Sequence, residues 1–120
     1  MSDFLLKGQP LELRHDGTLL RLSDWSLDVA EELARRDGLM LTNDHWDVLT
    51  VMRDYYQEYN ISPIRKLLVK EVREKLDAKK FQLAYLRKLF PSGLLTQSTR
   101  LAGIPLPLLD VEIDPVTHIR

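Results

Sequence analysis

The spacing of hydrophobic and polar positions divides the chain into a short first region and a long second one. In the first, the two apolar runs of FLLKGQPLEL are separated by KGQ, and an Asp-Gly pair at residues 16–17 precedes TLLRL. Turn residues between short apolar runs are typical of β-hairpins. We therefore predict a β-hairpin region over residues 1–22.

From residue 26 onward, apolar residues recur at the intervals of amphipathic helices. In NDHWDVLTVMRDYYQEY, for example, one face of the predicted helix consists of Val48, Met52, Tyr55 and Tyr59, and the residues beside that face are Trp46, Leu49 and Tyr56. Four other segments have comparable patterns: LDVAEELARRDG, IRKLLVKEVREKL, KKFQLAYLRKLF and LLTQSTRLA. The pattern predicts about five helices, with the aromatic stripe of the second one in the core.

Three positions are predicted to begin helices. Asn43 is the expected N-cap of the long second helix, and Ser62 followed by Pro63 has the order of an N-cap and a first helical residue. Asp77 is the expected cap of the fourth helix. The turn between the second and third helices is therefore short, as in a helix-turn-helix.

The last helix is predicted to stop at Gly103, and Pro105, Pro107 and Pro115 then favour an extended chain. We therefore predict one α+β domain, mostly α, over residues 1–120. It consists of the β-hairpin region, an orthogonal helical bundle over 26–103 and a C-terminal arm over 104–120.

Composition limits the chemistry that the chain can perform. It is 44% hydrophobic and 29% charged, as in an ordinary globular domain, and no apolar run approaches the roughly 20 residues of a membrane span. We expect a soluble, cytoplasmic protein without a membrane contact. The chain has no cysteine, which excludes disulfides, zinc thiolates and persulfide transfer through a thiol. His15, His45 and His118 lack the spacing of metal ligands, so we predict no metal, no cofactor and no enzyme active site.

Charge is distributed unevenly along the chain. Residues 65–88 contain nine basic and three acidic residues, a net charge of +6, so the remainder carries −7. Arg65, Lys66, Lys70 and Arg73 occupy the helix that would be the recognition helix of a helix-turn-helix. This pattern favours two interpretations: the solvated faces of two helices, or a nucleic-acid-binding surface.

The sequence also resembles a known family. The segments LTNDHWDVLTVMRDYYQEYNISPIRKLLVK, YLRKLFPSG and QSTRLAGIPLP are similar to the DsrC/TusE family, which includes sulfur-relay proteins and the gamma subunit of dissimilatory sulfite reductase. The resemblance depends on a His-Trp pair before RDYY, the N-x-S-P-x-R turn, and LFP-x-G followed by an A-G-I-P-x-P arm. It covers nearly the whole chain.

In that family the arm ends in a penultimate cysteine, which carries persulfide sulfur or docks in a partner's active site. Aligned through the Gly and Pro residues of the arm, that position is Asp110 here, and the second cysteine of DsrC corresponds to Thr99. A carboxylate cannot accept and release a sulfur atom. The resemblance thus implies a cysteine-free, non-catalytic protein with a regulatory or accessory role, whose partner belongs to a sulfur relay or a sulfite reductase. The predicted partner-binding residues are Thr99, Arg100, Leu106, Leu108 and Asp110.

Three alternatives remain open at this stage. The basic helix could make the protein a nucleic-acid-binding regulator. Asp110 could be an engineered replacement in a sulfur carrier for tRNA 2-thiolation or sulfite reduction. The arm leucines Leu106, Leu108 and Leu109 could pack back on the domain instead of meeting a partner. The physiological partner, the oligomeric state and the role of residues 112–120 are not determined by the sequence.

Overall fold

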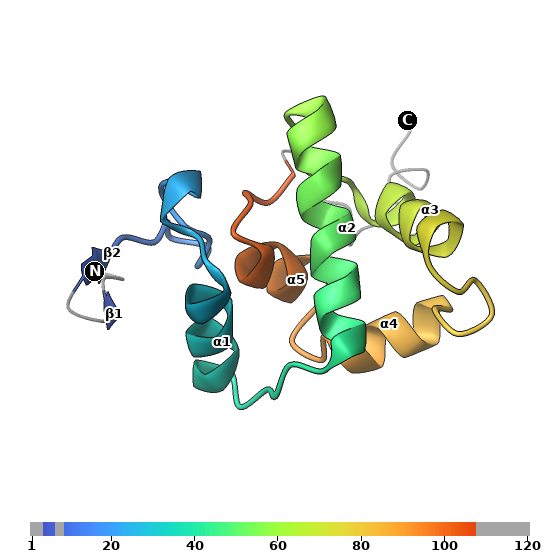
Figure 1. Cartoon of the computed structure of the whole chain (residues 1–120), viewed down its shortest axis with the longest axis horizontal. Helices are drawn as coiled ribbons and strands as arrows, with labels where there is room; N and C mark the ends of the chain where they lie inside the picture. Colours follow the sequence, from blue (N-terminus) through green and yellow to red (C-terminus); the bar gives the residue numbers. More distant parts are fainter. Residues whose placement is uncertain (1–3, 7–8, 108–120) are drawn as a thin grey trace.

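The computed structural model describes the backbone of residues 4–6 and 9–107 and the side chains of residues 11–107. Five α-helices lie in this part of the chain (Figure 1). They are α1 (Leu27–Arg36), α2 (Asn43–Tyr59), α3 (Arg65–Lys75), α4 (Leu83–Leu89) and α5 (Leu94–Ala102). A short 3₁₀ helix, η1 (Leu22–Asp24), precedes α1.

Helix α5 is the centre of the core. It packs against α1, α2 and α4, while α3 packs against α2. Seven of its nine residues are buried, which shows that the rest of the protein surrounds this helix on most sides. Because α5 leads directly into the predicted arm, the arm begins from the most firmly packed element of the fold.

The prediction of an α+β fold with an N-terminal β-hairpin is wrong, because the domain is all-helical in its core. Within the residues that the structure describes, extended pairing is limited to β1 (Phe4–Leu6) with β2 (Gln9–Leu11) and a single bridge between Leu13 and Leu19. A two-stranded ribbon of this size cannot form a layer of a domain. Leu11 and Leu19 are buried in the core cluster that the helices form. Their apolar side chains therefore belong to the helical core, and no second layer of sheet is needed to bury them.

Helix α2 begins one residue earlier than predicted. Thr42, not Asn43, is the N-cap, and its Oγ1 accepts a hydrogen bond from the His45 backbone N–H at 3.4 Å. In return, Nδ1 of His45 accepts a hydrogen bond from the Thr42 backbone N–H at 3.0 Å. This is a capping box in which histidine replaces the usual glutamate or glutamine.

The predicted starts of α3 and α4 are also wrong. Helix α3 begins at Arg65, two residues after Pro63, because the Ser62 hydroxyl donates to a carbonyl of the arm and caps no helix. The Asp77 carboxylate accepts the backbone N–H of Lys79 at 3.0 Å. It therefore stabilises a turn that precedes α4 and not the helix itself.

The buried face of α2 agrees with its periodicity only in part. Val48, Leu49 and Met52 are at most 1% exposed. Trp46 and Tyr56 are partly buried and pack against the same core. Tyr59, at the end of the stripe, is 53% exposed, because α2 extends beyond the helices that cover it (Figure 1).

Candidate functional site at the root of the arm

Helix α5 ends in a Schellman motif that begins the arm. Gly103 adopts a left-handed conformation with φ of 74°, its N–H donates to the Arg100 carbonyl, and the Ile104 N–H donates to the Thr99 carbonyl. This pair of bonds satisfies carbonyls that the helix leaves free. The predicted stop at Gly103 is confirmed. We refer to residues 103–107 as the arm root.

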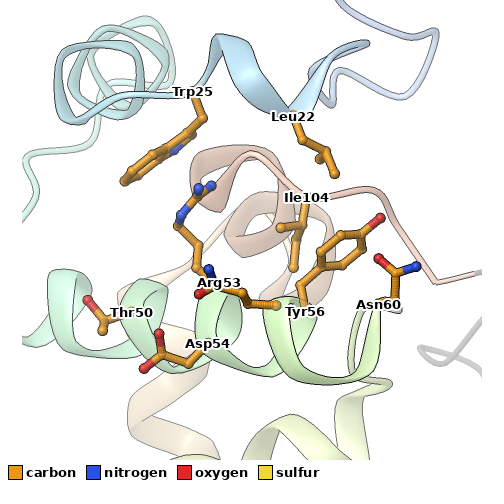
Figure 2. Close-up of a pocket in the computed structure, with 9 residues that line it drawn as sticks. Leu22, Trp25, Thr50, Arg53, Asp54, Tyr56, Asn60 and Ile104 are labelled. Atoms are coloured by element: carbon orange, nitrogen blue, oxygen red, sulfur yellow. The ribbon is translucent and has the colours of Figure 1, made fainter.

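Two side chains from other elements hold the last turn of α5 in place. The indole Nε1 of Trp25 donates to the Leu101 carbonyl at 2.8 Å, and Nη1 of Arg53 donates to the Ala102 carbonyl at 2.6 Å. The Arg53 guanidinium also lies over the Trp25 ring, 3.8 Å from its centroid (Figure 2). We call Trp25 and Arg53 the arm clamp. Together they join η1, α2 and α5 at the point where the arm begins.

Beyond the clamp, the arm root follows the connection between α2 and α3. Ile104 is 2% exposed and belongs to the core cluster. The Ser62 hydroxyl donates to the Pro105 carbonyl, and Leu106 is partly buried against the core. The core thus extends past the predicted boundary at residue 104, and the side-chain contacts of the arm root continue to Leu106.

Two hollows flank the arm root. The first, which we call the arginine cleft, has a volume of about 490 Å³ and lies between η1, α2 and the start of the arm (Figure 2). It is lined by Leu22, Trp25, Thr50, Arg53, Asp54, Tyr56, Gln57, Asn60 and Ile104. The second, which we call the proline groove, has a volume of about 320 Å³. It is lined by Tyr56, Asn60, Ile61, Ser62, Ile64, Pro105, Leu106 and Pro107.

The lining of the arginine cleft contains one cation, Arg53, and one carboxylate, Asp54. Burial lowers the pKa of this guanidinium, and the nearby Asp54 carboxylate partly opposes the effect. The guanidinium remains protonated at neutral pH, because the ordinary pKa of arginine lies far above that pH. Among the side chains that the structure describes, none forms an ion pair with Arg53. The cleft therefore presents a partly desolvated positive charge beside an aromatic ring.

The structure places the predicted partner-binding residues in different environments. Thr99 is fully buried, and its hydroxyl donates to the Leu95 carbonyl at 2.6 Å, so its predicted contact with a partner is not supported. Arg100 forms an ion pair with Asp37. Its partial burial lowers the pKa of its guanidinium. Leu106 lines the proline groove. Leu108 and Asp110 lie outside the described residues.

The basic residues predicted for nucleic-acid binding lie on α3 or at its start. Lys70 pairs with Glu74 at 3.2 Å along the helix, and Arg73 donates to the Ala78 carbonyl at 3.4 Å. Lys66 is exposed and Arg65 is partly buried. Binding of nucleic acid by this helix stays a prediction, and no contact of these residues favours it over a solvated helix face.

Sequence reasoning missed the arm clamp. Trp25 stands alone before α1, and Arg53 interrupts the apolar stripe of α2 within RDYY. A charged residue beside a core stripe is a usable signal, since it must find polar partners when the helix packs. Its hydrogen-bond partner, the Ala102 carbonyl, lies 49 residues away in sequence, and only the packing of α2 on α5 identifies it.

Two classes of site find no support in the part of the chain that the structure describes. No group of three or more His, Asp or Glu side chains there could hold a metal ion. None of the helices described combines the length and apolar character needed to cross a membrane.

The geometry defines a small helical protein that presents an anchored C-terminal segment, and comparison with known proteins gives its family. The family model described as "DsrC like protein" matches residues 5–109. A sulfurtransferase TusE homolog of Haemophilus influenzae is 44% identical over 102 residues, which cover 85% of this chain and 94% of that protein. The chain therefore belongs to the DsrC family, and the resemblance predicted from its motifs is confirmed.

Solved structures agree with this assignment. The NMR structure of DsrC from Allochromatium vinosum superposes with a TM-score of 0.82 at 38% identity, covering 91% of this chain and 97% of that one. The crystal structure of the oxidized gamma subunit of dissimilatory sulfite reductase from Archaeoglobus fulgidus has a TM-score of 0.78 at 33% identity. It covers 91% of this chain and 99% of the other.

Proposed function

We propose that this chain is a non-catalytic docking protein of sulfur metabolism. It binds a protein of a sulfur relay or of sulfite reductase in the cytoplasm, in a regulatory or accessory role. Its arm supplies the docking element, and Asp110 occupies the position at which the family resemblance places the sulfur-carrying cysteine. In this role the protein competes with a cysteine-bearing relative for the same partner.

The first support comes from chemistry. Persulfide transfer requires a sulfur nucleophile, and the 120 residues contain no cysteine. A carboxylate at position 110 retains the negative charge of a thiolate but forms no bond to sulfur. Recognition by charge and shape is therefore the property that the arm can share with its relatives.

The observation that carries the proposal is the construction of the arm root. Three side chains donate hydrogen bonds to backbone carbonyls between Leu101 and Pro105: those of Trp25, Arg53 and Ser62. Such contacts fix the position of the arm root, residues 103–107, against the core. A preoriented extended segment loses less conformational entropy on binding than a free one. The smaller loss of conformational entropy favours docking of the arm on a partner.

A competition experiment tests the proposal. The purified sulfur-donor complex of a cysteine-bearing TusE protein is immobilised, and the present chain is added with and without that relative. We expect saturable binding that the relative displaces, and loss of binding in a variant that ends at Pro107. A matched Lys79→Gln variant, changed at an exposed position outside the arm, should bind normally. If neither this complex nor a sulfite reductase core binds the full chain, the proposed role is wrong.

A further inference from the structure

The arginine cleft contains a guanidinium, that of Arg53, which forms no ion pair with any side chain that the structure describes. A guanidinium has five N–H donors in a planar fork. One of these donors, on Nη1 of Arg53, is directed at the Ala102 carbonyl, and the flat face of the guanidinium covers the Trp25 ring. Figure 2 shows the guanidinium directed from α2 into the space below Trp25. A planar fork with unused donors in a partly buried setting is well suited to bind a carboxylate.

The rest of the lining supports an anionic group that is part of a larger ligand. Thr50, Gln57 and Asn60 are uncharged and can donate hydrogen bonds to oxygen atoms. Asp54 lies on the exposed side of the cleft and is the acidic residue of the lining. The Asp54 carboxylate therefore opposes part of the attraction between Arg53 and an anionic ligand.

The cleft continues toward an apolar surface. Tyr56 and Asn60 line both the arginine cleft and the proline groove, so the two hollows adjoin on the last turns of α2. The groove adds Leu106 and Pro107 from the arm root and Ile61, which is 61% exposed. A ligand that spans both hollows would meet a cation at one end and aliphatic side chains at the other.

We propose that the arginine cleft and the proline groove together bind an acidic peptide segment of the partner protein, with a glutamate or aspartate carboxylate on Arg53 and a neighbouring aliphatic side chain in the groove. This inference rests on the proposed function and specifies the chemistry of the partner. The two hollows adjoin the arm root, so the arm and the arginine cleft would bind the same partner protein together.

Two capped peptides test this inference without the physiological partner. One has a single glutamate among leucines, and the other has glutamine in its place. Each is titrated into ¹⁵N-labelled full-length protein and followed by NMR. We expect the glutamate peptide to shift the Arg53 Nε–H and the Trp25 indole N–H, and to bind about tenfold more tightly than the glutamine peptide. The indole N–H of Trp46, which is outside the lining, is the internal control.

Variants separate ligand binding from the structural role of the clamp. Arg53→Gln should remove the preference for glutamate, whereas Asp54→Asn, which touches no clamp contact, should increase affinity for the glutamate peptide about threefold. Lys79→Gln removes one positive charge, as Arg53→Gln does, but at a distant position, and it should change neither the preference for glutamate nor the affinity. If Arg53→Gln does not fold, the Asp54 variant and the peptide pair still decide the question. Equal affinity for the two peptides, or no binding of either, overturns the inference even where the full partner binds.

Discussion

The indole ring of Trp25 occupies the space that a Cβ atom at position 103 would need, while its Nε1 holds the Leu101 carbonyl at 2.8 Å. Glycine is therefore required at position 103 for two reasons: its φ of 74° is positive, and the Trp25 ring leaves no room for a Cβ atom. We predict that Gly103→Ala lowers the free energy of unfolding by on the order of 3 kcal/mol, from left-handed strain and from overpacking together. Urea denaturation measures the loss.

Gly38 provides a matched control for this substitution. It has the same φ of 74°, but no atom lies within 4 Å of its hypothetical Cβ. Gly38→Ala should therefore cost only the backbone term, about 1 kcal/mol. Equal losses at the two positions would show that the Trp25 ring yields freely and that the contact has no part in fixing the arm.

Leu49 tests the assignment of the buried face of α2. Its side chain is 1% exposed within the core cluster. Leu49→Ala should lower the free energy of unfolding by about 2–4 kcal/mol through lost burial and a residual cavity. Leu27→Ala, at a side chain that is 61% exposed, should change it by no more than about 0.5 kcal/mol. Similar effects of both changes in thermal or urea unfolding would contradict the described core.

Asp44 predicts a pH dependence of stability. Hydrogen bonds from the Tyr85 hydroxyl and from Lys80 hold the pKa of this carboxyl below its ordinary value of 3.8. A carboxyl with a lower pKa in the folded state stabilises the fold above its unfolded pKa, and this contribution disappears as the pH falls through the folded pKa. Asp44→Asn should thus be less stable than the parent at pH 7, with the difference shrinking below pH 3.8.

Tyr85→Phe isolates the main cause of this shift. The Tyr85 hydroxyl is the largest contributor to the lowered pKa of Asp44, and Lys80, at 2.9 Å, is the second. The stability difference between Tyr85→Phe and Asp44→Asn should therefore change less with pH than the stability difference between the parent and Asp44→Asn. Urea midpoints at pH 7 and at pH 2.5–3 measure both differences. A constant difference between parent and Asp44→Asn across this range would refute the assignment.

The absence of cysteine leads to a prediction about labelling. Incubated with a cysteine desulfurase and ³⁵S-labelled cysteine, the chain should acquire no covalent label, because it offers no thiolate to load. Asp110→Cys should acquire a label that dithiothreitol removes, since this is the position that the family resemblance assigns to the cysteine. Label on the parent chain, located by mass spectrometry, would contradict the non-catalytic role.

Local sequence determined the helices and the place where the last one stops. The 3.6-residue spacing in LDVAEELARR and in the α2 segment is an intrinsic property of each helix, so it identifies the elements without knowledge of their neighbours. Gly103 is similar, because a left-handed C′ position selects glycine from backbone geometry alone. The family motifs also lie in continuous segments. Each of these features depends on residues close together in the chain.

The tertiary structure decided the features that depend on distant partners. The turn residues between short apolar runs before residue 22 predicted a β-hairpin region, but Leu11 and Leu19 are buried in the core that the helices form, because a short apolar run can pack in either setting. Ser62 and Pro63 resembled a helix start, yet the Ser62 hydroxyl binds the carbonyl of Pro105. The arm clamp joins Trp25 and Arg53 to carbonyls 76 and 49 residues away. Hydrogen-bond partners at such separations are selected by packing, which the local pattern of residues does not encode.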